Sequence, residues 1–102
     1  YETPDGKVPY DIWYEAIKDV RLRDAVDNRL ERVEKGLYGD CDTVGGPVLE
    51  LRFKGFGVRI YFVEIGEIIV LLLCAGDKSS QNKDIEKAHI YWNEYCNRIE
   101  EV

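Results

Sequence analysis

The most informative segment is residues 48–75, which read VLELRFKGFGVRIYFVEIGEIIVLLLCA. It holds three apolar runs, at residues 48–53, 58–65 and 68–75, with short glycine-containing links and no helical pattern between them. Strands that follow each other through such short links pair antiparallel. The segment therefore predicts a meander of three antiparallel strands.

Helical patterns precede this meander. Pro9 opens the first helix, at a position where its missing N–H is no loss. Apolar residues at three- and four-residue steps mark the inward face of that helix, which consists of Tyr10, Trp13, Ile17 and Val20. A second helix is predicted from about residue 21 to 35, where Gly36 ends it. Its inward stripe is Leu22, Val26, Leu30 and Val33.

A third helix follows the meander, from about residue 81 to 99, with Ser80 as its N-cap. Its expected inward residues are Ile85, Ala88, Trp92, Cys96 and Ile99. Residues 39–47, rich in glycine and closed by a proline, are predicted to be a loop. The residues before the turn at positions 4–6 are expected to end an N-terminal strand.

These elements predict an α+β fold in a single domain, residues 1–102. The small antiparallel sheet would contain the three C-terminal strands and the N-terminal one. A chain of 102 residues can bury one hydrophobic core without the help of disulfides or metal ions. We expect the first, second and last helices to cover one sheet face, above Leu49, Leu51, Phe53, Ile60, Phe62, Ile69 and Leu71.

Charge and hydropathy exclude two classes of partner. With 20 acidic and 14 basic residues, the formal net charge is −6, so a broadly basic surface that coats nucleic acid is excluded. Any contact with a polyanion must therefore be made by a local patch of the surface. The longest apolar run, residues 68–75, falls short of the about 18 residues that a membrane span needs. No membrane partner is expected.

The cysteines and the histidine argue against several enzyme classes. Cys41, Cys74 and Cys96 are odd in number and widely spaced, which suits neither a disulfide framework nor a zinc site. We expect structural free thiols, a reducing cytoplasm as the compartment, and no metal or cofactor. His89 is the single histidine, and without a GxSxG turn a serine or cysteine nucleophile is disfavoured. His89 is expected to be structural.

Alternation along the first two strands of the meander brings charged residues together. If Gly55-Phe56 is a two-residue turn, Arg52 lies opposite Arg59, and Glu50 lies opposite Tyr61 on the same face. This face is the one turned away from Leu49, Leu51 and Phe53. The same counting, carried across a turn at Gly66-Glu67, places Arg59 opposite Cys74.

Two arginines directly opposite each other on a sheet repel, so the pair needs a compensating anion. Glu50 offers part of the compensation. A bound anion would offer the rest, and Lys78, which arrives just before a helix N-terminus, favours such a site. The alternative is that Arg52 and Arg59 are surface arginines paired with nearby carboxylates. The sequence pattern leaves both interpretations open, because a slip of one residue in the turn would change the face.

Several segments resemble the RelE/ParE superfamily of bacterial toxins, and most closely its HigB-like, phage-derived branch of addiction-module killer proteins. They are residues 48–52 (VLELR), 57–62 (GVRIYF) and 76–81 (GDKSSQ), with Asp84-Ile85. The resemblance covers essentially the whole chain, and GDKSSQ is its most specific part. It implies the toxin of a type II toxin–antitoxin system: cytoplasmic, RelE-like in fold, and neutralised by a small cognate antitoxin, expected to be a helix-turn-helix protein.

The resemblance also implies a chemistry. Ribosome-dependent members of the family are mRNA endonucleases (mRNA interferases) that inhibit translation by cleaving mRNA in the ribosome without a metal. On that basis Arg59, Arg52 and Lys78 would stabilise the scissile phosphate, because fixed cations stabilise charge that develops on phosphoryl oxygens. RNA contacts are expected from Lys54, Ser79 and Gln81.

The resemblance to the family leaves the general base and the class of function open. Glu50, the nearest carboxylate, is a candidate general base, but it stands where RelE-type members carry a lysine. The chain could instead be a non-enzymatic toxin like the ParE members, which inhibit DNA gyrase through protein contacts. It could also be an inactive member that mainly binds its antitoxin.

Overall fold

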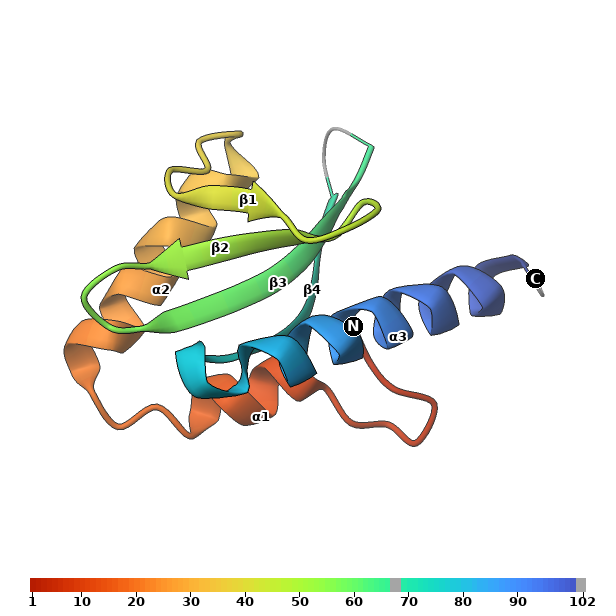
Figure 1. Ribbon diagram of the computed structural model, residues 1–102, viewed down its shortest axis with the longest axis horizontal. Helices are drawn as coiled ribbons and strands as arrows, with labels where there is room; N and C mark the ends of the chain where they lie inside the picture. The colour runs from red at the N-terminus through yellow and green to blue at the C-terminus, as the bar shows by residue number, and fades with distance from the viewer. Residues whose placement is uncertain (67–68, 101–102) are drawn as a thin grey trace.

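The computed structural model describes residues 1–66 and 69–100, and within them the chain has the α+β fold that the sequence predicts (Figure 1). The strands form one antiparallel sheet in the order β1-β2-β3-β4. The elements are α1 (Pro9–Glu15), α2 (Val20–Glu34), β1 (Cys41–Thr43), β2 (Leu49–Phe53), β3 (Val58–Ile65), β4 (Ile69–Asp77), the 3₁₀ turn η1 (Lys78–Ser80) and α3 (Gln81–Glu100).

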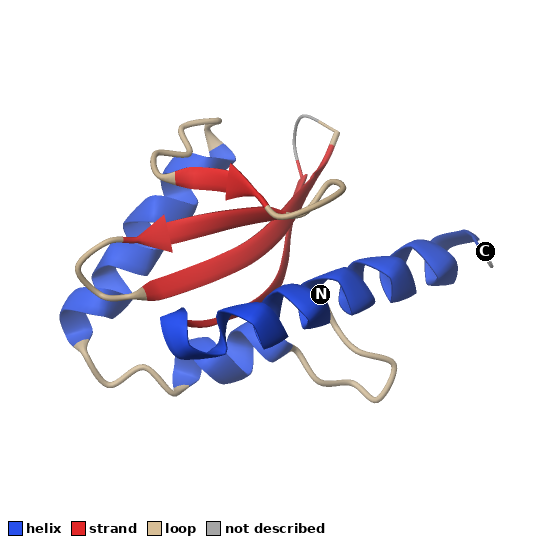
Figure 2. Ribbon diagram, viewed as in Figure 1, coloured by secondary structure: helices blue, strands red, loops and turns tan. Residues whose placement is uncertain are grey.

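The helices lie on both faces of the sheet, so the expectation of three helices on one face is wrong (Figures 1 and 2). Helices α1 and α2 cover the face that carries Leu51, Ile60 and Phe62. Helix α3 covers the opposite face, where Ala88 packs with Tyr61, Val63, Leu73 and Cys74. The reason lies in β3, which is apolar at both alternating sets of positions and therefore needs a cover on each side.

Other details of the predicted core also change. Leu71 packs on the α3 face with Val63, not beneath α1 and α2, and Ile69 is exposed. Ile99, expected to face inward, is exposed near the end of α3.

The pairing of β2 with β3 confirms the predicted register: Arg52 lies opposite Arg59, and Glu50 opposite Tyr61. The turn differs from the expected one. The carbonyl of Phe53 accepts from the amides of Phe56 and Gly57, and Gly55 has φ 91°. The tight turn is therefore centred one residue earlier, while the pairing it produces is unchanged.

The pairing of β3 with β4 differs from the prediction. Arg59 lies opposite Gly76, not Cys74, and Cys74 pairs with Tyr61. Two features cause the shift: Ile65 pairs with Ile69, so the connection is longer than the two residues assumed, and the register slips once more between Tyr61 and Phe62. Parts of the expected turn and of the expected strand start, Glu67 and Ile68, lie outside the described residues.

The fourth strand is β1, inside the segment predicted to be a loop, and not at the N-terminus. Residues 1–8 form no strand; instead the terminal ammonium of Tyr1 donates to the carbonyl of Leu72 over 2.8 Å. β1 pairs with the edge of β2, with Asp42 opposite Glu50.

The helix boundaries differ from the predicted ones because residues that the sequence did not single out act as caps. α1 ends at Glu15, and the Asp19 carboxylate then caps α2 by accepting from the amide of Arg21. Ile17 therefore lies outside α1, and Val20 is exposed at the start of α2. Asp77 caps the 3₁₀ turn η1, which leads into α3, by accepting from the amides of Ser79 and Ser80. None of the described helices has the length and apolar character to cross a membrane.

Cys74 and His89 take part in the packing of the fold, as predicted. All three thiols are free, and burial raises the pKa of Cys74 to about 12. The ring nitrogen Nε2 of His89 lies 2.8 Å from the carbonyl oxygen of Val44, which ties α3 to the turn before β2.

Candidate functional site

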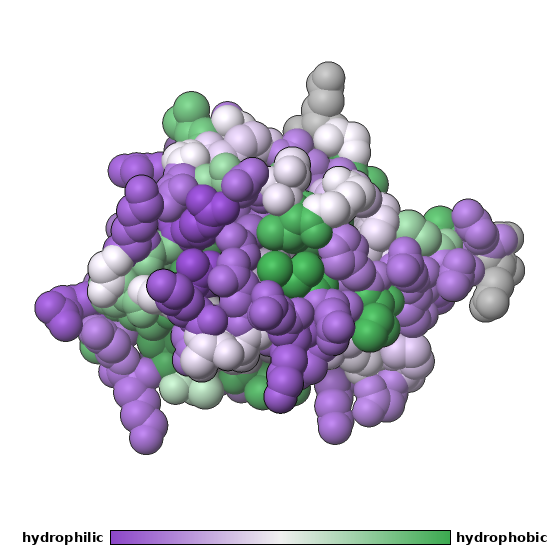
Figure 3. Space-filling model, in the orientation of Figure 1, coloured by the Kyte–Doolittle hydropathy of each residue, from purple (hydrophilic) through white to green (hydrophobic). Residues whose placement is uncertain are grey.

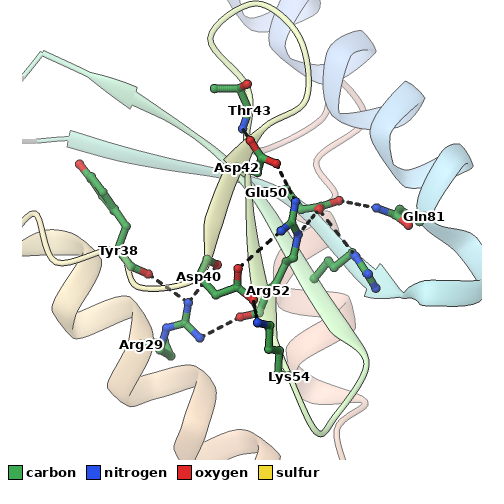
Figure 4. A network of polar contacts seen from close by, with 10 residues as sticks. Arg29, Tyr38, Asp40, Asp42, Thr43, Glu50, Arg52, Lys54 and Gln81 are labelled. Carbon is green, nitrogen blue, oxygen red and sulfur yellow. Dashed lines mark hydrogen bonds and ion pairs between the residues drawn. The ribbon is translucent and has the colours of Figure 1, made fainter.

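The site is built on the pair of opposed arginines in β2 and β3. The guanidinium of Arg52 bonds carboxylates in three directions: Nε donates to Glu50 Oε1 over 2.9 Å and Nη2 to Asp42 Oδ2 over 2.9 Å, while Nη1 lies 3.5 Å from Asp40 Oδ1 (Figure 4). The hydrogen bonds to Glu50 and Asp42 raise the pKa of Arg52. The bond from Arg52 lowers the pKa of Asp42. Carboxylates thus offset the repulsion between the two arginines.

Glu50 is the buried centre of this cluster, with 1% of its surface exposed. Its Oε2 accepts hydrogen bonds from the Tyr61 hydroxyl and the Gln81 amide, each over 2.9 Å. Burial alone would raise the pKa of Glu50, but the hydrogen bonds from Arg52, Gln81 and Tyr61 outweigh it and lower the pKa below its ordinary value. A carboxylate that is buried and fully bonded cannot reach a substrate proton, so Glu50 positions other groups.

Arg59 is the less neutralised of the two arginines. Its side chain is 16% exposed, and its Nε lies 3.7 Å from Glu50 Oε1. Within residues 1–66 and 69–100 this Nε is buried without a hydrogen-bond partner, and no hydrogen bond or ion pair is found for the Nη groups. Those N–H groups are the donors best able to bind an anion.

The other residues predicted for the site lie around the arginines, and each makes different contacts. Lys78 is exposed, and its backbone amide donates to the Gly57 carbonyl over 3.0 Å, which places it at the start of β3, close to Arg59 in the fold. The Ser79 hydroxyl donates to the capping carboxylate of Asp77, and so it is part of the turn. Gln81 faces Glu50, as described above.

Lys54 lies at the end of β2, on the side toward α2 (Figure 4). Its side chain is 85% exposed, and its Nζ is 3.8 Å from Asp40 Oδ2. Figure 3 shows that hydrophilic side chains dominate the molecular face over β1 and β2.

The carboxylates Asp40 and Asp42 are the site residues that sequence reasoning missed. They precede and enter β1, a strand of three residues that holds Asp42 opposite Glu50. The local signal is the alternation of Asp40 and Asp42 around Cys41, which is too short to separate a strand from a loop.

Comparison with known proteins shows similarity to a bacterial protein. An uncharacterized protein of Haemophilus influenzae is 37% identical over 82 residues, which cover 79% of this chain and 83% of that protein. No family model and no solved structure matches the chain. In the described part of the chain no three His, Cys, Asp or Glu side chains are grouped as ligands for a metal ion.

Proposed function

The chain belongs to the same protein family as the Haemophilus influenzae protein, and we propose that it is the toxin of a type II toxin–antitoxin pair: a metal-independent endoribonuclease that cleaves mRNA in the ribosome. The proposal rests on the resemblance of residues 48–52, 57–62 and 76–81 to RelE/ParE toxins, and on the arrangement around Arg59. Its place of action would be the cytoplasm.

The observation that carries the proposal is the state of Arg59. Buried Glu50 lies beside its Nε and so helps to fix the arginine, while its Nη groups have no partner among the described residues. An arginine that lies 3.7 Å from a buried carboxylate, with no guanidinium hydrogen bond among the described residues, is suited to a phosphate, which guanidinium groups bind with paired N–H donors.

The proposed reaction needs electrostatics more than proton transfer by the protein. The ribose 2′-hydroxyl loses its proton to water as its oxygen attacks the adjacent phosphorus, and negative charge develops on the phosphoryl oxygens. The bond from phosphorus to the 5′-oxygen breaks, the leaving 5′-oxygen takes a proton from water, and the products are a 2′,3′-cyclic phosphate and a 5′-hydroxyl. Arg59 would stabilise that charge, with Lys78 beside it and Arg52 across the strand pair. Glu50 and Gln81 would keep the arginines in position.

The proposed partner is a small antitoxin encoded beside this chain. The sheet has two edges, β1 and the nine-residue β4, and edge strands pair readily with an added strand from another chain. Pull-down with the products of the neighbouring genes tests this part, and failure of both neighbours to bind would contradict it.

The test of activity is inducible expression of Arg59→Ala, followed by mapping of 5′ ends in cellular mRNA. We expect cleavage to fall by about 10²–10³-fold, the usual loss for one aimed donor. Arg21→Ala is the matched control, because the Arg21 side chain is 85% exposed and pairs only with Asp19 among the described residues. Unchanged cleavage in a folded Arg59→Ala protein would refute the role of Arg59.

Two observations favour a second function, inhibition of DNA gyrase through protein contacts. Arg52 already bonds three carboxylates, and the chain has a net charge of −6, which weakens attraction to RNA. Growth inhibition without mRNA cuts, together with loss of supercoiling in a gyrase assay, would select this alternative.

A further inference from the structure

Asp84, in the first turn of α3, is a buried carboxylate with 7% of its surface exposed. Unlike Glu50, it has no ion pair with any of the described residues, and the side-chain hydrogen bond that it makes is with the Ser80 hydroxyl, which donates to Oδ2 over 2.5 Å. Burial of a charge without a counter-charge lowers stability, so this carboxylate indicates a task other than stabilising the fold.

The carboxylate of Asp84 occupies the space that a side chain at position 76 would fill. A Cβ on Gly76 would overlap this carboxylate and lie 2.8 Å from Ser80 Oγ. Gly76 lies directly opposite Arg59 in the pairing of β3 with β4. Because directly opposed residues direct their side chains to the same face of a sheet, the carboxylate of Asp84 lies on the same face as Arg59, across the strand pair from it.

The charge of Asp84 also acts on the cluster at Glu50. Burial and the hydrogen bond to Glu50 raise the pKa of the Tyr61 hydroxyl; the charge of Asp84 raises it further, and the charge of Arg59 lowers it. Two buried carboxylates, Glu50 and Asp84, therefore belong to the surroundings of Arg59.

Ser80 connects Asp84 to the turn η1, which carries Lys78. Figure 1 shows this turn beside the start of β3, where the Lys78 amide donates to the Gly57 carbonyl over 3.0 Å. The turn has two further attachments: the Ser80 amide donates to the exposed carboxylate of Asp77, and the Ser80 hydroxyl donates to Asp84. Of these three attachments, the one to Asp84 joins the turn to a buried side chain.

We propose that Asp84 is a positioning residue of the anion site: its hydrogen bond with Ser80 fixes the turn η1 and thereby holds Lys78 beside Arg59. This role rests on the proposed function, in which Lys78 and Arg59 bind the same phosphate. Lysine carries its charge on a flexible four-carbon chain, so its backbone must be held in place if the charge is to be directed at an anion. The glycine at position 76 leaves the room that the carboxylate needs.

The test compares Asp84→Asn with Asp84→Ala in titrations of the full chain with inorganic phosphate, followed by NMR of the Arg59 Nε–H and the Lys78 amide. Both variants remove the charge, but only asparagine keeps an oxygen that can accept from Ser80. We expect Asp84→Ala to bind phosphate about 1.5- to 5-fold more weakly than Asp84→Asn, which corresponds to the contribution of one exposed ion pair. Asp84→Asn itself should bind phosphate at least as tightly as wild type, because one negative charge is removed.

The dependence on Lys78 separates positioning from a merely structural role. In a Lys78→Ala background the two Asp84 variants should bind phosphate equally, because the group that Asp84 positions is gone. Ser80→Ala removes the same hydrogen bond at a partly exposed position, and it should weaken phosphate binding by the same factor even if Asp84→Ala does not fold. Glu86 is the matched control: it is exposed on the same helix, and Glu86→Gln and Glu86→Ala should bind phosphate equally.

Equal phosphate affinity of Asp84→Asn and Asp84→Ala, or a difference between them that persists without Lys78, would overturn the role of Asp84 even in a protein that cleaves mRNA. A wild-type protein in which phosphate shifts neither the Arg59 nor the Lys78 signal would overturn it as well. The expected pattern in a protein that cuts no mRNA would keep the positioning role and overturn the proposed function.

Discussion

Replacing Glu50 with glutamine keeps the size of the buried side chain and removes its charge. Glu50 accepts three hydrogen bonds, from Arg52, Tyr61 and Gln81, each over 2.9 Å. A hydrogen bond to a charged group contributes about 1.5–3 kcal/mol, and one between neutral groups about 0.5–1.5 kcal/mol. The single carbonyl oxygen of glutamine can keep either the bond at Oε1 or the two at Oε2, each weakened by about 1 kcal/mol, while the amide NH2 at the other position faces a donor and that bond is lost. Arg59, 3.7 Å away, also loses its counter-charge.

The expected loss in the free energy of unfolding is about 3–5 kcal/mol, the cost of breaking a buried ion pair. Domains of this size are stable by about 5–15 kcal/mol, so the Glu50→Gln protein should still fold, with a melting temperature lower by at least about 12 °C. Urea unfolding monitored by circular dichroism measures the difference. Glu64→Gln is the matched control, because Glu64 lies exposed on β3, and its effect should stay within about 0.5 kcal/mol.

The difference in unfolding free energy between wild type and Glu50→Gln should decrease as the pH falls. The pKa of Glu50 in the folded protein is below its ordinary value of 4.5, so its contribution to stability is complete above 4.5 and is lost as the pH falls through the folded value. The gap between wild type and Glu50→Gln should therefore be widest at neutral pH and close in acid. An unchanged unfolding free energy at neutral pH, or a gap that persists undiminished in acid, would refute the central role of Glu50.

Arg52→Ala should lower the melting temperature more than Arg59→Ala does, because Arg52 bonds three carboxylates and Arg59 faces one; differential scanning fluorimetry compares them. Gly76→Ala should destabilise by about 1–3 kcal/mol in urea unfolding, since a Cβ there would overlap the Asp84 carboxylate and lie 2.8 Å from Ser80 Oγ. The Cys74 thiol, with its pKa raised to about 12, should react with a disulfide reagent at pH 8 far more slowly in the folded than in the unfolded protein; equal rates would contradict its burial.

The register of the arginine pair was predictable because it depends on local geometry. Side chains alternate with a period of two, and the turn between β2 and β3 leaves little freedom of pairing. Even a turn centred one residue from the expected place kept Arg52 opposite Arg59. The next pairing was not predictable, because the slip at Tyr61/Phe62 is an irregularity that no glycine or proline marks.

The face covered by each helix could not be read from the sequence. Helix α3 has an apolar stripe, and so do α1 and α2, but a stripe does not specify which side of a sheet it meets. The information was in β3, where Tyr61 and Val63 on one face are as large and buried as Ile60 and Phe62 on the other. A strand apolar on both faces requires two covering layers, and the single-face expectation overlooked that requirement.

The acidic residues around Arg52 are compatible with a role in RNA binding, because they contact its guanidinium in two different ways. Glu50 is buried and bonds Nε, the nitrogen nearest the backbone, and thereby sets the direction of the guanidinium. Asp42 bonds Nη2 with a side chain that is 61% exposed, and such exposed pairs contribute little to stability. A phosphate could therefore replace Asp42 at small cost while Glu50 keeps the arginine in place. In this way an acidic protein can carry an arginine pair whose charge is compensated by carboxylates in the free protein. The pair can still bind an anion.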